Sequence, residues 1–127
     1  KKKMFEKNVK DMNKFTYHVC GIGEKVGTAF TTSHKVGRIK NSGTVAVPMK
    51  TIDSFNFENV TFIKYDIEGY ELKALQGSEQ TIKKYYPVIV VEQNKGNFYA
   101  KELLESWGYK FKGLDQVFYQ DYIMVKE

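Results

Sequence analysis

The chain has 127 residues, 42% of them hydrophobic and 15% aromatic, which is enough for one domain with a core and too apolar for a disordered chain. Its net charge is +5, and no apolar run approaches the roughly 20 residues that a membrane-spanning helix needs. The single cysteine, Cys20, excludes an internal disulfide framework and is typical of a reducing compartment. We therefore expect a cytoplasmic protein without a membrane partner.

The positive charge is carried almost wholly by lysine and favours a solvated surface. A nucleic-acid interface is better indicated by arginines interleaved with aromatic residues along one face, and the sequence has no such stripe. We expect no nucleic-acid partner and no zinc site. The sequence opens on "KKK" rather than methionine and leads straight into a helical pattern, so we expect a domain truncated at its N-terminus.

The first half of the chain predicts one helix followed by three strands. Residues 4–13 predict the helix, because apolar residues recur there at helical spacing. The β-rich segments "FTYHVCGI" (15–22), "GTAFTTS" (27–33) and "TVAVPMKTI" (44–52) predict the strands. Pro48 shifts the last of them toward a sheet edge or a strand end.

Three glycines in "CGIGEKVG" follow the first predicted strand: Gly21, Gly23 and Gly27. A phosphate-type loop would need a helix to begin there, because the helix N-terminus holds the ligand. The residues that follow are β-prone instead. We therefore expect a turn between two strands.

The second half alternates strands and helices before a terminal hairpin. The predicted elements are strands at 59–67 and 87–94, helices at 68–77, 78–86 and 97–108, and a hairpin over 109–126. This order predicts one α/β domain whose sheet is mostly parallel, with an antiparallel hairpin at its edge. The β-branched run at 87–94 is typical of a strand that is covered on both faces.

Acidic residues lie where two predicted strands end. Asp66, Glu68 and Gly69 stand at the joint between the strand at 59–67 and its helix, and Glu92 ends the next strand. Acids in the first turn of a helix are also favoured by the helix dipole alone. If the strands are parallel, however, the carboxylates meet at one edge of the sheet. They would then suit general-base chemistry on a hydroxyl, a metal site, or hydrogen bonds to a ligand amine.

The segment "VTFIKYDIEGYELKALQGSEQTIKKYYPVIVVEQ" resembles the FkbM family of S-adenosylmethionine-dependent methyltransferases. That family has a strand ending in Asp-x-Glu-Gly, then a helix, a proline and a strand that closes on glutamate. Upstream, "FEKNVKDMNKFTYHVCGIGEKVGTAFTTS" and "VPMKTIDSF" are similar to other parts of the family. The matching positions are Asp66, Glu68, Gly69, Glu71, Leu75, Gly77, Pro87 and Glu92.

The resemblance implies a Rossmann-like fold that binds S-adenosylmethionine and transfers its methyl group to a hydroxyl of a sugar or similar small molecule. It places Asp66 at the boundary between cofactor and substrate, with Glu68 and Glu92 facing the acceptor. It also places three residues beside the adenine: Cys20, Gly21 and Ile22.

The family's first strand, its glycine-rich methyl-donor loop and its second strand have no counterpart in the sequence. We therefore expect an incomplete Rossmann-like sheet, and weak or no binding of S-adenosylmethionine by this chain alone. The strand at 59–67 would keep an unpaired edge unless residues 15–22, a second chain, or the missing strands as a further part of the same polypeptide filled it. A homo-oligomer is therefore possible through that edge. The alternative to an enzyme is a methyltransferase-like remnant without activity that serves as a scaffold or interaction module.

Overall fold

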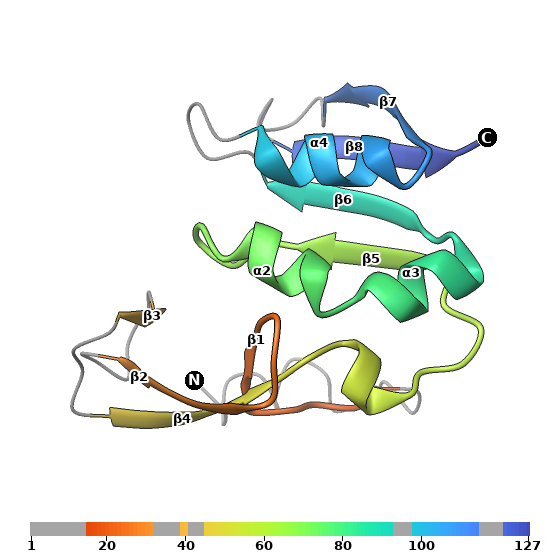
Figure 1. Ribbon diagram of the computed structural model, residues 1–127. Coiled ribbons are helices and arrows are strands. Elements are labelled where there is room, and N and C mark those ends of the chain that lie inside the picture. The colour runs from red at the N-terminus through yellow and green to blue at the C-terminus, as the bar shows by residue number, and fades with distance from the viewer. Residues whose placement is uncertain (1–14, 32–38, 41–44, 93–97, 115–120) are drawn as a thin grey trace.

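The structure is a computed structural model that describes residues 15–31, 39–40, 45–92, 98–114 and 121–127. The described residues form two four-stranded sheets and three α-helices (Figure 1). The first sheet has the order β1-β4-β2-β3 and contains β1 (Gly21–Ile22), β2 (Gly27–Thr31), β3 (Ile39–Lys40) and β4 (Val45–Lys50). The second has the order β5-β6-β8-β7 and contains β5 (Phe62–Tyr65), β6 (Val88–Glu92), β7 (Tyr109–Leu114) and β8 (Asp121–Lys126).

Three α-helices lie on one face of the second sheet, as Figure 1 shows: α2 (Glu71–Gln76), α3 (Glu79–Tyr85) and α4 (Tyr99–Ser106). Strand β6 is the centre of the core beneath them. Its Ile89 lies opposite Ile63 of β5 on one side and Met124 of β8 on the other. Leu75 of α2 and Leu104 of α4 are fully buried in the same cluster. Each such side chain contributes about 1.5–3 kcal/mol by leaving water.

A short 3₁₀ helix, η1 (Asp53–Phe55), connects the two sheets through Asp53. The Asp53 carboxylate accepts hydrogen bonds from the backbone amides of Gln80 and Thr81 and from the Thr81 hydroxyl, at 2.7–3.1 Å. Its own amide donates to the Gly77 carbonyl at 3.0 Å. Asp53 therefore caps the start of α3, while the N-cap residue Ser78 makes no side-chain cap bond.

Gly77 ends α2 as the sequence predicts, but its backbone is not left-handed, with φ at −79°. Glycine is required there because the backbone of Gly23 approaches Gly77 closely. A Cβ atom on Gly77 would lie 2.0 Å from the Gly23 carbonyl oxygen and 3.1 Å from the Thr51 Cβ. The loop after β1 therefore packs directly on the end of α2.

The predicted helix–strand alternation of the second half is confirmed. The strands near residues 60 and 87 and the hairpin are contiguous, in the order β5-β6-β8-β7. The prediction of one mostly parallel sheet is wrong. Among the described strands, the β1–β4 and β5–β6 pairs are parallel, whereas β2 pairs antiparallel with β3 and β4, and β8 pairs antiparallel with β6 and β7.

Two local predictions are corrected, and one lies outside the described residues. Of the predicted strand at 15–22 only Gly21–Ile22 is a strand, and residues 15–19 are exposed and have no regular secondary structure. Strand β6 is not covered on both faces, since Val88 remains 38% exposed on the side opposite the helices. The predicted helix at 4–13 lies outside the described part of the chain.

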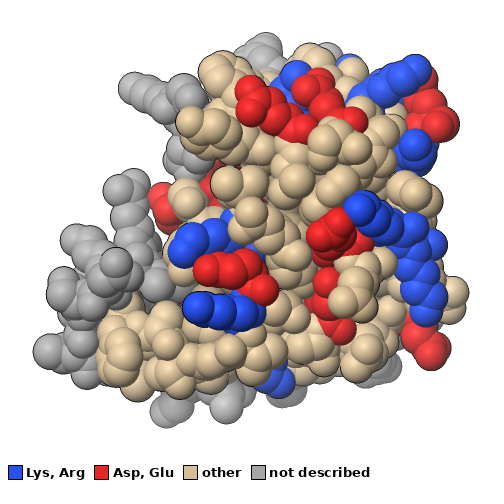
Figure 2. Space-filling view, viewed as in Figure 1, with Lys and Arg blue, Asp and Glu red and all other residues tan. Residues whose placement is uncertain are grey.

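Charged side chains of both signs are mixed on the helix-bearing face that Figure 2 shows. Lys83 pairs with Glu79 along α3, and Lys101 pairs with Glu105 along α4. The described residues on this face do not form a basic stripe of the kind that nucleic-acid binding favours. Among the described residues, no helix is both long enough and apolar enough to cross a membrane.

Candidate active site

Three acidic side chains meet at the carboxyl ends of β5 and β6. Asp66 and Glu68 follow β5 directly, and Glu92 is the last residue of β6. Because the two strands are parallel neighbours, their ends lie at the same edge of the sheet. One carboxylate oxygen from each residue lies within 4.8 Å of the others. The structure therefore brings together the three residues that the sequence singles out.

Glu71 holds the turn that presents Glu68. This side chain is only 3% exposed, and its Oε1 accepts hydrogen bonds from the backbone amides of Ile67 and Gly69, both at 3.1 Å. Between them Glu68 adopts a left-handed backbone with φ at +56°, and Gly69 has φ at +96°. A non-glycine residue is held in this region only when its surroundings fix it. Sequence reasoning gave Glu71 a place in the family motif but no structural role.

The surroundings of Glu92 disfavour the ionised form of its carboxyl. Burial is the main cause that raises the pKa of its carboxyl above the ordinary value, and the nearby charges of Asp66, Glu68, Glu71 and Asp121 raise it further. Its Oε2 is buried and accepts no hydrogen bond from the described residues. A carboxylate in this state is better able to take up a proton than an exposed one.

Lys64 and Asp121 complete the site, and sequence reasoning missed both. The Lys64 ammonium lies 3.1 Å from an Asp121 oxygen and 3.6 Å from an Asp66 oxygen. The hydrogen bond to Asp121 is the main cause that raises the pKa of Lys64. Asp121 itself is buried, on β8 directly opposite Glu92 of β6. The site thus contains more carboxylates than cations among its described residues.

Cys20, Gly21 and Ile22 lie at the start of the first sheet, and none of their described contacts reaches the three carboxylates. They are half-buried, and Ile22 packs against the main core. The loop that follows them does reach α2, because Glu24 pairs with Lys73 at 3.5 Å. The loop after these three residues therefore contacts α2, while the three residues themselves do not join the acidic site.

The arrangement suits the three uses that the sequence left open. A carboxylate with a raised pKa can take a proton from a hydroxyl, and a cluster of carboxylates can bind a ligand amine. The same three residues, Asp66, Glu68 and Glu92, would be the ligands of a hard divalent cation, although exposed acidic groups are common without one.

Comparison with known proteins decides the family. The model of the methyltransferase FkbM domain matches residues 4–122 of the chain. The chain belongs to the FkbM methyltransferase family. Among solved structures, it is similar to the methyltransferase FkbM from Methylobacillus flagellatus KT, with 22% sequence identity and a TM-score of 0.67. No curated protein matches the chain.

The likeness to the solved FkbM structure supports the fold. It covers 96% of this chain and 32% of the other, so the chain spans about a third of the length of the methyltransferase that it matches. The two proteins share the mixed α/β architecture. The reaction, the cofactor and the roles of individual residues in this chain are argued from the site itself.

Proposed function

We propose that this chain forms the acceptor side of an S-adenosylmethionine-dependent O-methyltransferase that acts on a hydroxyl of a sugar or similar small molecule. The observation that carries the proposal is the meeting of Asp66, Glu68 and Glu92 at the ends of two parallel strands. Membership of a methyltransferase family supplies the reaction class. The single cysteine supports a cytoplasmic location.

When bound, S-adenosylmethionine supplies a methyl group that is attached to a positively charged sulfur. The sulfur becomes a neutral thioether when the methyl group is transferred. The attacking hydroxyl oxygen forms the new bond to carbon and must lose its proton. Glu92 would accept that proton; its buried Oε2, which has no partner among the described residues, and the raised pKa of its carboxyl support this role. Glu68 would bind the acceptor, and Asp66 would lie between acceptor and cofactor.

The residues present fit such a cofactor on electrostatic grounds. Asp66, Glu68 and Glu92 make the region negative, while the neighbouring Lys64 is engaged by Asp121 at 3.1 Å. A negative region attracts a sulfonium ion and releases the neutral product more readily. Cys20, Gly21 and Ile22 are the candidates for contact with the adenine, through the half-buried start of the first sheet.

The test is methyl transfer from S-adenosylmethionine to a mixture of hexoses, followed as formation of S-adenosylhomocysteine. Glu92→Gln keeps the size of the side chain and removes the proton acceptor. We expect it to lower turnover by about 10²-fold or more, as loss of a general base does. Glu79→Gln is the matched control, because Glu79 is an exposed glutamate that pairs with Lys83 on α3. Equal turnover of both variants would show that Glu92 does not act as the general base.

The alternative is a methyltransferase-like remnant that serves as a scaffold. The described residues give no separate observation in its favour. A longer chain that contains this domain, binds S-adenosylmethionine and still forms no S-adenosylhomocysteine with any hexose would make the remnant the better account.

A further inference from the structure

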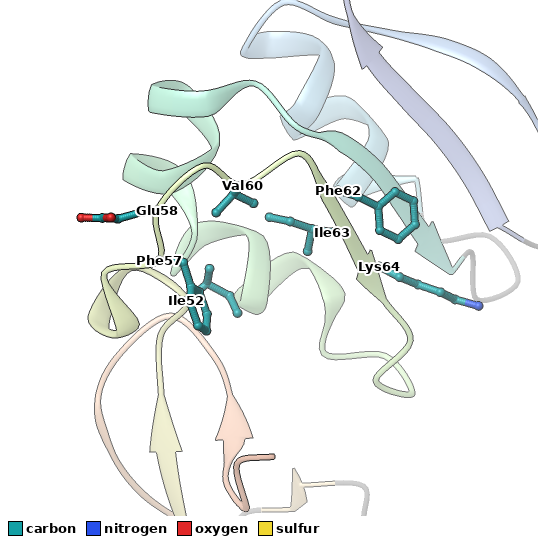
Figure 3. A pocket seen from close by; sticks show the side chains of 7 residues that line it. All are labelled: Ile52, Phe57, Glu58, Val60, Phe62, Ile63 and Lys64. Carbon is teal, nitrogen blue, oxygen red and sulfur yellow. The ribbon is translucent and has the colours of Figure 1, made fainter. Parts of the chain in front are cut away.

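Lys64 and Asp121 form an ion pair that crosses the second sheet. Lys64 lies opposite Val90 of β6, and Val90 in turn lies opposite Ile123 of β8. Consecutive side chains of a strand point to opposite faces. Ile63 packs against the core, and Figure 3 shows Lys64 pointing away from Ile63. The Lys64 side chain therefore passes over β6 on the face opposite the described helices, and its ammonium ends 3.1 Å from an Asp121 oxygen.

Two carboxylates share this ammonium, and Asp121 holds it more firmly. The second carboxylate, that of Asp66, has its nearer oxygen 3.6 Å away. Asp121 is only 5% exposed, and its strand is an inner one of the sheet, between β6 and β7. A buried carboxylate depends on a charged partner, because it has lost the water that would otherwise stabilise its charge. The pair with Asp121 therefore keeps the ammonium on the β8 side of the site.

The position of this ammonium affects Asp66, which the proposed function places beside the cofactor. If the charge of Asp121 were removed, Asp66 would be the remaining ion-pair partner of Lys64 among the described residues. The ammonium would then neutralise the Asp66 carboxylate and bring a positive charge toward the place proposed for a sulfonium ion. Because like charges repel, a sulfonium ion would bind there less well.

We propose that Asp121 is a positioning residue, which holds Lys64 away from Asp66 and so keeps the Asp66 carboxylate free for a positively charged ligand. This role is separate from the proton transfer that the proposed function gives to Glu92. The identity of the ligand, a sulfonium ion, rests on the proposed function. The pairing of Lys64 with Asp121 does not, so the two can be tested apart.

The first experiment needs no ligand. In an isotope-labelled chain, NMR can detect scalar coupling across the hydrogen bond from the Lys64 ammonium to its acceptor. We expect coupling to the Asp121 carboxyl carbon in the wild type and in Asp66→Asn, and to the Asp66 carboxyl carbon in Asp121→Asn. Coupling to Asp66 or to neither residue in the wild type would overturn the proposal. So would a Lys64 that pairs with Glu92, or with no carboxylate, in Asp121→Asn.

The second experiment compares S-adenosylmethionine with S-adenosylhomocysteine, which differ in one methyl group and in the charge of the sulfur. The ratio of their dissociation constants, measured by NMR titration, reports the charge beside the sulfur, whereas a disturbed fold weakens both ligands alike. Asp121→Asn should lower the preference for S-adenosylmethionine by about fivefold or more. Glu79→Gln is the matched control, because it likewise removes the carboxylate partner of one lysine, Lys83 of α3, and should leave the ratio unchanged.

A double variant separates positioning from packing. Lys64→Met added to Asp121→Asn removes the displaced cation and leaves neither charge of the pair without its partner, so the chain should fold and regain the wild-type ratio. A ratio that stays low in the double variant, or that is unchanged in Asp121→Asn alone, would overturn the proposal. If the wild type binds neither ligand, this chain alone does not assemble the cofactor site, and the coupling experiment decides whether Asp121 holds Lys64.

Discussion

Replacing Glu71 tests whether one buried carboxylate holds the turn that carries the candidate site. Glu71→Ala removes the acceptor of two amide hydrogen bonds, from Ile67 and Gly69, both 3.1 Å long. Hydrogen bonds to a charged group contribute about 1.5–3 kcal/mol each. These are longer than the roughly 2.7–2.9 Å typical of charge-assisted bonds, so the lower end applies. The expected loss is about 3 kcal/mol of the free energy of unfolding.

Glu71→Gln separates charge from geometry. The same oxygen accepts both bonds in the structure, and an amide oxygen can replace it at about half the strength, so the expected loss is about 1.5 kcal/mol. Glu79→Ala is the control, because Glu79 is likewise the first residue of a helix but is exposed. Its cost should stay within about 0.5 kcal/mol. The assay is urea unfolding followed by circular dichroism, and equal costs for Glu71→Ala and Glu79→Ala would refute the reasoning.

Three further outcomes are expected. Gly77→Ala should cost about 3 kcal/mol or more, because the new Cβ would lie 2.0 Å from the Gly23 carbonyl oxygen; an unchanged melting temperature would contradict this. Glu92→Gln should change how stability depends on pH: the native state holds the Glu92 proton more tightly than the unfolded state, so the wild type loses stability relative to the variant as pH rises above 4.5. Parallel pH–stability curves would refute it. Tyr109→Phe removes a 2.8 Å bond to the buried Pro87 carbonyl and should cost about 1 kcal/mol in urea unfolding, whereas no loss would show that water replaces the hydroxyl.

Local patterns predicted the elements of the second half well, because each element there buries an apolar face. The run at 87–94 became β6, whose Ile89 and Val91 are fully buried. Helix α3 (Glu79–Tyr85) lies within the helix predicted at 78–86. In such segments the hydrophobic pattern and the tertiary structure agree.

Predictions that depended on a distant partner were less successful. Residues 15–19 have strong β propensity, but they do not form a strand, and Val19 is 70% exposed. The need for glycine at 77 comes from the Gly23 carbonyl, which is remote in sequence. Residue propensities cannot predict the exposure of residues 15–19 or the need for glycine at 77, because both depend on how the two sheets pack together.

Some residues of the candidate site could likewise be predicted from the sequence, and others could not. Asp66, Glu68 and Glu92 could be predicted to meet, because the ends of neighbouring parallel strands share one edge. Asp121 could not, because it comes from β8, which lies between β6 and β7 in the sheet but after both in the sequence. Its position opposite Glu92 depends on that order.

The most direct test of the central claim is saturation-transfer NMR of S-adenosylhomocysteine with the whole chain. This method detects weak binding, which suits a chain for which we expect weak or no binding of the cofactor. We predict transfer from the protein to the ligand that is strongly reduced in Asp66→Ala and unchanged in Glu79→Ala. Equal transfer in both variants would contradict the assignment of Asp66 to a methyltransferase site, whereas no transfer from a folded chain at millimolar ligand would mean that this chain alone does not assemble the cofactor site.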